Sequence, residues 1–183
     1  MSDLESQTKP LLKSVVQGEQ VMLKTAQQQE LGTWAVKIAM VEDGRKTKAL
    51  PRSYTFAETQ AFRESKAIPE HTHVWLGRSS RVAVALTTSG IRMSAGGAWN
   101  EGMITTIVLG HCVFQVFSLH LLDAGPGPHF DVLVPKGEWD QLLIPIWPRQ
   151  DAVAWPPELD FTNDDGASSL TKLRQRFHFG AEV

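Results

Sequence analysis

The run of residues from Cys112 to Leu122 is the feature that most constrains how this chain folds. Apolar residues recur at every second position along it, and the side chains that share one face are Val113, Gln115, Phe117 and Leu119. Successive side chains of a β-strand point to opposite faces, so this alternation predicts a strand. The sequence is therefore expected to form its core around a β-sheet.

Further strands and a few helices are predicted around this run. Apolar alternation or β-rich composition predicts strands over 34–40, 73–76, 81–86, 104–109, 131–135 and 141–147. A turn is expected at Ser89-Gly90 and a glycine-rich loop over 94–102. Helices are predicted over 11–26, after a loose tail at 1–10, over 56–66 and over 169–179, and residues 148–168 are expected to form an extended loop.

The second of these helices has a clear start signal. Thr55 is followed three residues later by Glu58, the spacing of a capping box, and the helix is expected to end by Pro69. With 183 residues and more strands than helices, the chain is expected to form a single α+β domain. This domain would have a mainly antiparallel sheet, a short helix after the first strand and a C-terminal helix.

Residues 1–30 are expected to form an N-terminal arm, with residues 31–183 as the globular domain. The arm carries more apolar surface than a free tail should expose, and a polar link at 27–30 lets it dock on its own domain or on a neighbour. The residues predicted to mediate self-association are Leu11, Leu12, Val15, Val16, Met22 and Leu23. The predicted result is a concentration-dependent, head-to-tail oligomer.

Charge is distributed unevenly along the chain. The net charge is −2, which argues against a strongly basic nucleic-acid binder, and no sequence-specific nucleic acid is expected as a partner. Residues 1–100 carry a net charge of +4 and residues 101–183 a net charge of −6. The predicted basic face consists of Arg45, Lys46, Lys48, Arg52, Arg78 and Arg81. Opposed faces would orient a second copy head to tail, unless the two groups interleave in the fold and cancel.

The single cysteine excludes an internal disulfide and favours a reducing compartment. Cys112 lies next to His111, but neighbours in a strand face opposite ways, so the pair is not expected to share a proton. Cys112 is instead expected to be a small core residue. Neither a signal peptide nor a transmembrane segment is expected.

His71 and His73 are the candidate metal ligands, because two imidazoles two residues apart lie on one side of a strand. The segment Pro135-x-Gly137-x-x-Asp140 resembles half of the second motif of cupin barrels. A cupin-like metal-dependent enzyme or binder using His71, His73 and Asp140 is therefore one alternative. The favoured expectation is that the chain binds no metal or cofactor, has no catalytic residues and is not an enzyme.

Three tryptophans lie near prolines in the second half of the chain, namely Trp139, Trp147 and Trp155. Clusters of tryptophan and proline form peptide-binding grooves and interface hot spots in other proteins. A peptide-binding adaptor is therefore a further alternative, the simpler one being that these rings pack the 148–168 loop onto the sheet.

The order of elements resembles that of rhabdovirus matrix proteins. The segments that carry the resemblance are the arm, the strand at 34–40, a basic loop at 46–52, the helix at 56–66, the sheet through 74–78 and 82–86, a long strand ending at Asp123, residues 161–165, and the helix and tail at 169–180. The resemblance implies a small structural protein that self-associates, condenses the viral nucleocapsid and contributes to virion assembly at a membrane. A short matrix protein from a plant-infecting relative fits best.

The same resemblance implies the partners and the place of action. The chain itself, a viral nucleoprotein and a membrane surface would be the partners, and the protein would lie in the host cytoplasm and in the virion.

Overall fold

A computed structural model describes residues 2–45, 52–95, 98–121, 141–148 and 151–161. Its elements in chain order are α1 (Ser2–Val16), β1 (Val21–Leu23), α2 (Thr25–Gly44), α3 (Phe56–Ser65), β2 (Thr72–Ala95), β3 (Ala98–Leu121), β4 (Leu143–Trp147), β5 (Val153–Trp155) and β6 (Asp160–Phe161). The strands form a four-stranded sheet and a two-stranded sheet. The α+β class and the mainly antiparallel sheet are confirmed.

The β2–β3 hairpin is the centre of the larger sheet. Its antiparallel register runs from Thr72 opposite Ser118 to Ala95 opposite Ala98. The predicted strands at 73–76, 81–86 and 104–109 are all parts of this hairpin, as is the run from Cys112. The predicted turn at Ser89-Gly90 is wrong, because both residues pair within the ladder, and the predicted loop at 94–102 is largely strand.

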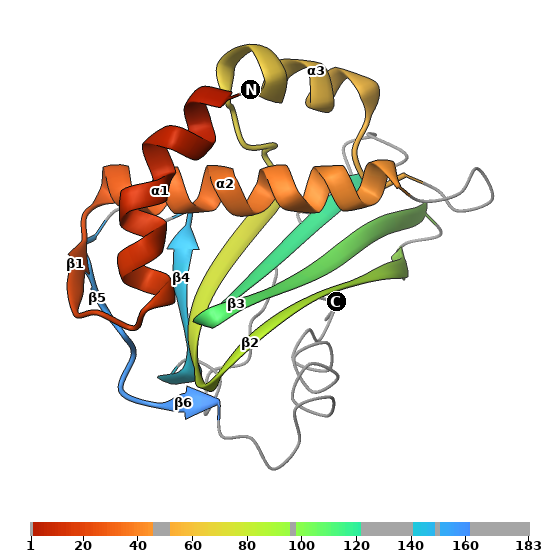
Figure 1. The fold of residues 1–183 in the computed structure, drawn as a ribbon. Helices are drawn as coiled ribbons and strands as arrows, with labels where there is room; N and C mark the ends of the chain where they lie inside the picture. The colour runs from red at the N-terminus through yellow and green to blue at the C-terminus, as the bar shows by residue number, and fades with distance from the viewer. Residues whose placement is uncertain (1, 46–51, 96–97, 122–140, 149–150, 162–183) are drawn as a thin grey trace.

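The hairpin bends back on itself near its middle. The register shifts between Arg78 and Ala83, and Gly110 on the opposite strand has a φ of +61°. A Cβ atom at Gly102 would lie 3.1 Å from the carbonyl oxygen of Ser118, so the first half of β3 returns beside its second half. Figure 1 shows these halves side by side in the sheet.

Helix α2 lies across one face of the sheet (Figure 1). The prediction of a strand over 34–40 is wrong, because this segment is in the middle of α2. Residues 31–37 are all buried, and the Trp34 and Phe114 rings contact each other with centroids 5.3 Å apart. A helix buried on most of its surface has apolar residues at many spacings, so its sequence can also match strand alternation.

The N-terminal segment is part of the same core. The predicted loose tail at 1–10 is helical from Ser2, and the predicted helix over 11–26 ends at Val16 before β1. Val15 and Leu23 have no exposed surface, and Leu11, Leu12 and Val16 pack against the core that contains them. Of the residues predicted to mediate self-association, Met22 alone is largely exposed, at 56%. The expectation of an arm docking on a neighbour is therefore corrected, because these side chains bury themselves in their own chain.

Residues distant in sequence hold this segment in place. Strand β1 pairs with β5 in antiparallel register. The buried Gln28 amide donates hydrogen bonds to the carbonyl oxygens of Leu23, at 2.9 Å, and Asp151, at 2.6 Å. The end of β1 and the segment just before β5 are thus both linked to α2.

Two short strands lie along the edge of β2 opposite β3. Strand β4 pairs antiparallel with β2 from Val74 to Gly77, and β6 pairs parallel with it at Arg78 and Ser79. The predicted strand at 141–147 is confirmed over Leu143–Trp147. Residues 148–168, predicted as a loop, include β5 and β6. The predicted strand at 131–135 and helix at 169–179 lie outside the described residues.

Within the described ranges, no helix has the length and apolar character needed to cross a membrane.

Replacing Gly110 is expected to destabilise the fold. The Gly110→Ala substitution places a Cβ atom 2.5 Å from Val16 Cγ1 and 2.7 Å from the Val16 carbonyl oxygen, at a left-handed φ. The backbone strain and the clash together should cost about 2–4 kcal/mol of unfolding free energy, measured by urea denaturation. Gly90→Ala is the matched control, because its Cβ atom would meet nothing within 4 Å. Equal effects of the two substitutions would contradict the close approach of α1 to the bend.

Candidate functional site

The candidate site is a cavity of about 370 Å³ beneath α3, bounded by the start of α1 and the second half of α2. Its size is within the range of small-molecule sites. The apolar side chains that line it are Leu4, Met40, Val41 and Phe62. The cavity therefore offers an apolar interior to a ligand.

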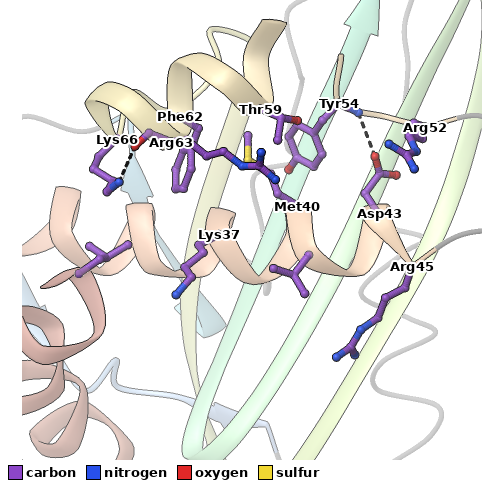
Figure 2. Close-up of a pocket in the computed structure, with 13 residues that line it drawn as sticks. Lys37, Met40, Asp43, Arg45, Arg52, Tyr54, Thr59, Phe62, Arg63 and Lys66 are labelled. Atoms are coloured by element: carbon purple, nitrogen blue, oxygen red, sulfur yellow. Dashed lines mark hydrogen bonds between the residues drawn. The ribbon is translucent and has the colours of Figure 1, made fainter. Parts of the chain in front are cut away.

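The polar lining of this cavity is mainly cationic. Figure 2 shows Arg52, Arg63 and Lys66 on the side of α2 that faces α3, whereas the Arg45 side chain extends away from α3. The basic residues in the lining are Lys37, Arg45, Arg52, Arg63 and Lys66, and the acidic residue is Asp43. An anion entering the cavity would therefore meet an excess of positive charge.

Three of these cations already have partners within the chain. Lys37 forms a salt bridge with Glu5 at 2.5 Å, which holds the pKa of the Glu5 carboxyl below its usual value. Arg45 pairs with Glu42, one turn earlier on α2. The Lys66 ammonium group donates to the carbonyl oxygen of Arg63 at 2.8 Å.

Arg52 and Arg63 differ from the other cations of the cavity. Both are exposed and line its rim. Across the described residues, neither guanidinium group has a hydrogen bond or an ion pair. These two groups are therefore the ones free to bind an anion without breaking an existing contact.

Asp43 holds the chain segment that carries Arg52. Its buried carboxylate accepts hydrogen bonds from the backbone N–H groups of Ser53, at 3.0 Å, and Tyr54, at 3.1 Å. Asp43 thus fixes the position of Arg52 near the end of α2.

Tyr54 connects this segment to the sheet. Its hydroxyl group lies 2.5 Å from Ser118 Oγ, which in turn lies 3.2 Å from Thr72 Oγ1. All three hydroxyl groups are buried, and burial raises the pKa of Tyr54 well above its usual value. The wall of the cavity is therefore anchored to both strands of the hairpin.

Local sequence signals set the orientation of α3. The capping box predicted from Thr55 and Glu58 is confirmed: the Glu58 N–H donates to Thr55 Oγ1 at 3.1 Å, and the Thr55 N–H donates to Glu58 Oε2 at 2.7 Å. The helix ends at Ser65, before Pro69 as predicted. Residues 59, 62, 63 and 66 then all line the cavity, because their spacing places them on one side of the helix.

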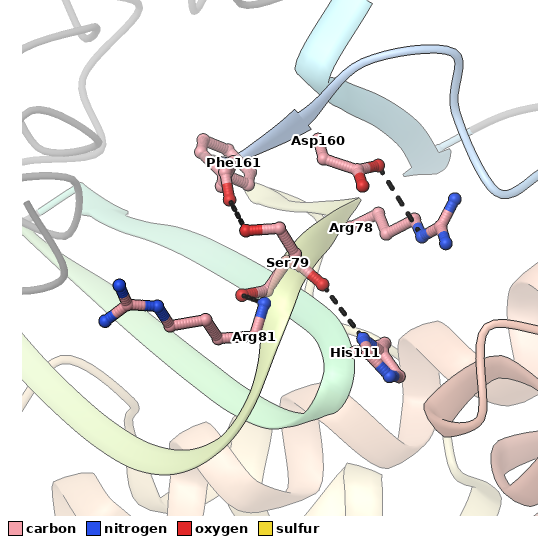
Figure 3. Close-up of polar contacts among 7 residues, drawn as sticks. Arg78, Ser79, Arg81, His111, Asp160 and Phe161 are labelled. Atoms are coloured by element: carbon pink, nitrogen blue, oxygen red, sulfur yellow. Dashed lines mark hydrogen bonds and ion pairs between the residues drawn. The ribbon is translucent and has the colours of Figure 1, made fainter. Parts of the chain in front are cut away.

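The predicted basic face is divided between two places. Arg45 and Arg52 line the cavity, whereas Lys46 and Lys48 lie outside the described residues. Arg78 and Arg81 lie at the bend of β2, as Figure 3 shows. The expectation of one face formed by the described arginines is therefore wrong, since the bend of the sheet separates them from the end of α2.

The contacts at this bend are structural. Arg78 Nε lies 3.5 Å from the Asp160 carboxylate, and the Ser80 hydroxyl donates to the carbonyl oxygen of Phe161 at 3.1 Å. His111 Nδ1 lies 3.1 Å from the carbonyl oxygen of Ser79 (Figure 3). These contacts hold β6 against β2, and β2 against β3.

Sequence reasoning missed Lys37, Arg63 and Lys66 as site residues. The sequence did contain a signal for Arg63 and Lys66. The capping box fixes where the helix begins, and the spacing of three and four residues from there shows which residues share a side. Lys37 could not be found, since its segment was predicted as a strand.

The two candidate metal ligands that the structure describes, His71 and His73, are not part of a metal-binding cluster. His71 is exposed, the His73 ring stacks on Trp75 with centroids 5.7 Å apart, and Asp140 lies outside the described residues. In the part of the chain that the structure describes, no group of three or more His, Cys, Asp or Glu side chains could hold a metal ion. The structure therefore gives the cupin-like alternative no support.

The two described tryptophans of the predicted aromatic interface do not form a surface cluster. Trp155 is 2% exposed and packs in the core, Trp147 is partly buried against it, and Trp139 lies outside the described residues. Trp155 instead helps to pack β5 onto the chain, as the simpler alternative expected. The described rings give the peptide-binding alternative no support.

Cys112 is a buried core residue, as predicted. Its thiol donates to the carbonyl oxygen of Leu109 at 2.9 Å, and burial raises its pKa to about 12. The thiol therefore keeps its proton at neutral pH, which makes it a poor nucleophile.

Comparison of the chain with models of protein families, with curated proteins and with solved structures finds no match. The function is therefore inferred from the residues of the site.

Alkaline pH is expected to destabilise the folded chain through Cys112 and Tyr54. Both pKa values are raised in the folded state, so the unfolded chain loses these protons at lower pH than the folded chain does. The stabilisation from keeping each group protonated is complete below the pKa of that group in the unfolded chain, about 8.5 for cysteine and about 10 for tyrosine. It is lost as pH rises above that value, by up to about 1.4 kcal/mol per pH unit for each group.

Urea denaturation of the wild type and of Cys112→Ser between pH 8 and pH 10 measures this effect. The wild-type free energy of unfolding should fall more steeply with pH than that of the variant, which lacks the ionisable thiol. Parallel curves would show that the thiol is not protected by burial.

Proposed function

We propose that this chain is a binding protein that takes an anionic molecule with an apolar body into the cavity beneath α3. The observation that carries the proposal is a pair of guanidinium groups at the rim of an apolar cavity, those of Arg52 and Arg63, which have no partner among the described residues. A carboxylate, sulfonate or phosphate group would bind at this rim, and its apolar part would enter the cavity.

Charge and burial favour the same ligand class. Hydrogen bonds between a guanidinium group and an anion are stronger than hydrogen bonds between two neutral groups. Both arginines are exposed, so on binding these hydrogen bonds would replace contacts of the guanidinium groups with water. The Asp43 carboxylate is turned toward backbone N–H groups, so it opposes an anion less than an exposed acid would. Contact with Met40 and Phe62 adds about 25 cal/mol for each Å² of apolar surface buried.

The state of the lining residues favours binding over catalysis. Asp43 and Tyr54 are the lining residues best suited to move a proton, and both are engaged in buried hydrogen bonds that hold the wall together. Lys37 is paired with Glu5. A general acid or base needs a group that is free to reach the substrate.

The viral matrix-type function stays a prediction, as do its partners and its location in host cytoplasm and virion. The self-association predicted through the N-terminal arm no longer supports it, because the apolar side chains of that arm pack within their own chain. The cationic cavity supports one part of it, since Arg45 and Arg52 of the predicted basic face both line a site suited to anions.

The proposal predicts that the chain binds decanoate more tightly than decanol. Both have the same apolar chain length, but decanol lacks the charge that Arg52 and Arg63 would bind. In isothermal titration calorimetry below the micelle concentration, the Arg52→Gln/Arg63→Gln variant should bind decanoate about 10- to 100-fold more weakly than the wild type.

Arg81→Gln is the matched control, because Arg81 is an exposed arginine at the bend of β2, away from the cavity. This variant should bind decanoate as the wild type does. Equal binding of decanol and decanoate, or an equal loss in Arg81→Gln, would contradict the proposed site.

A further inference from the structure

The second half of β2 forms an open edge of the sheet. Strand β3 pairs with it along one side from Ala83 to Ala95. On the other side, β4 and β6 pair with β2 up to Ser79, and beyond that residue no described strand continues the sheet. An open edge presents backbone N–H and C=O groups that another strand can pair with.

This edge carries apolar side chains exposed to solvent. Val82 is 73% exposed, Val84 is 83% exposed and Leu86 is 39% exposed. They alternate along the strand, so they share one face. Natural edge strands are usually protected by charged residues or proline, but the sequence from Val82 to Ile91 contains neither.

We propose that two copies of this chain pair antiparallel through the outer edge of β2, with a twofold axis at Val84. In this register, Val84 faces Val84 of the second copy, and Val82 of each copy faces Leu86 of the other. All three exposed side chains of both copies then form one continuous apolar row. Pairs of β-branched and aliphatic residues across strands stabilise a sheet.

The charged residue next to this edge, Arg81, is compatible with pairing to a second copy of the same strand. Arg81 would face Thr87 of the other copy, so the pairing sets no arginine directly opposite another arginine. A twofold interface requires a surface that is complementary to itself, and this segment meets that requirement. The open edge, rather than the N-terminal segment, then links the copies, and the contact is isologous rather than head to tail.

The oligomeric state of the full chain tests the proposal. Sedimentation velocity over about a hundred-fold range of concentration should show a dimer that dissociates on dilution. Val84→Lys should be monomeric over the same range, and its melting temperature should equal that of the wild type diluted to the monomer, because the Val84 side chain is mostly exposed. Phe56→Lys is the matched control, since Phe56 is also 83% exposed but lies at the start of α3. This control should remain dimeric.

Single cysteine variants test the register. Opposed residues in an antiparallel pair have Cα atoms about 4.5–5.5 Å apart, which suits a disulfide. Val84→Cys should therefore form a covalent dimer rapidly when oxidised glutathione takes up the two electrons of the thiol pair. Val82→Cys should react slowly, because its two copies would be separated by four residues, or about 13 Å, along the strands. The native Cys112 is buried and does not compete.

The following results would overturn the proposal. The first is a wild type that stays monomeric at the highest concentration. The second is a Val84→Lys variant that dimerises as tightly as the wild type, or a dimer that Phe56→Lys disrupts instead. The third is equally fast crosslinking of Val82→Cys and Val84→Cys, which would exclude an axis at Val84.

Discussion

The fold depends on the bend of the β2–β3 hairpin. A straight hairpin with strands of this length would extend far beyond a small domain, and α2 could cover only part of it. The register shift between Arg78 and Ala83, opposite the left-handed Gly110, brings the first half of β3 back beside its second half. Residues from both halves, such as Ile107 and Phe114, then enter the same core. The bend also leaves the second half of β2 at the outside of the sheet.

A second set of contacts joins the helical layer to that sheet. The Asp43 carboxylate at the end of α2 accepts from the backbone of Tyr54, and the Tyr54 hydroxyl contacts Ser118 on β3. Each contact satisfies a buried polar group that would otherwise destabilise the fold. The chain between α2 and α3 is therefore fixed at a point next to Arg52. The position of a cation at the cavity rim thus follows from interactions needed for stability.

The sequence predicted the features that depend on local residues. The alternation in β2 and β3 and the capping box at Thr55 were found because each signal lies within a few residues. Helix α2 was missed because its neighbours bury most of its surface, so Trp34, Val36 and Ile38 match a strand as well as a helix. The packing of residues 2–23 was missed because it depends on partners distant in sequence, such as β5 and Gly110. Similarly, no local pattern indicates that Arg52 and Arg63 meet at one cavity.

The two proposed surfaces are on different layers of the molecule. The cavity is formed by α1, α2 and α3, whereas the open edge belongs to the second half of β2 (Figure 1). Pairing of two copies through that edge would leave both cavities accessible. Such a dimer would carry two cationic sites in a fixed relation, and a surface that displays many anionic groups could engage both at once. The second contact would then be intramolecular, so the dimer would bind such a surface more tightly than a single chain without any new contact. Self-association and anion binding would in this way reinforce each other, although each depends on separate residues.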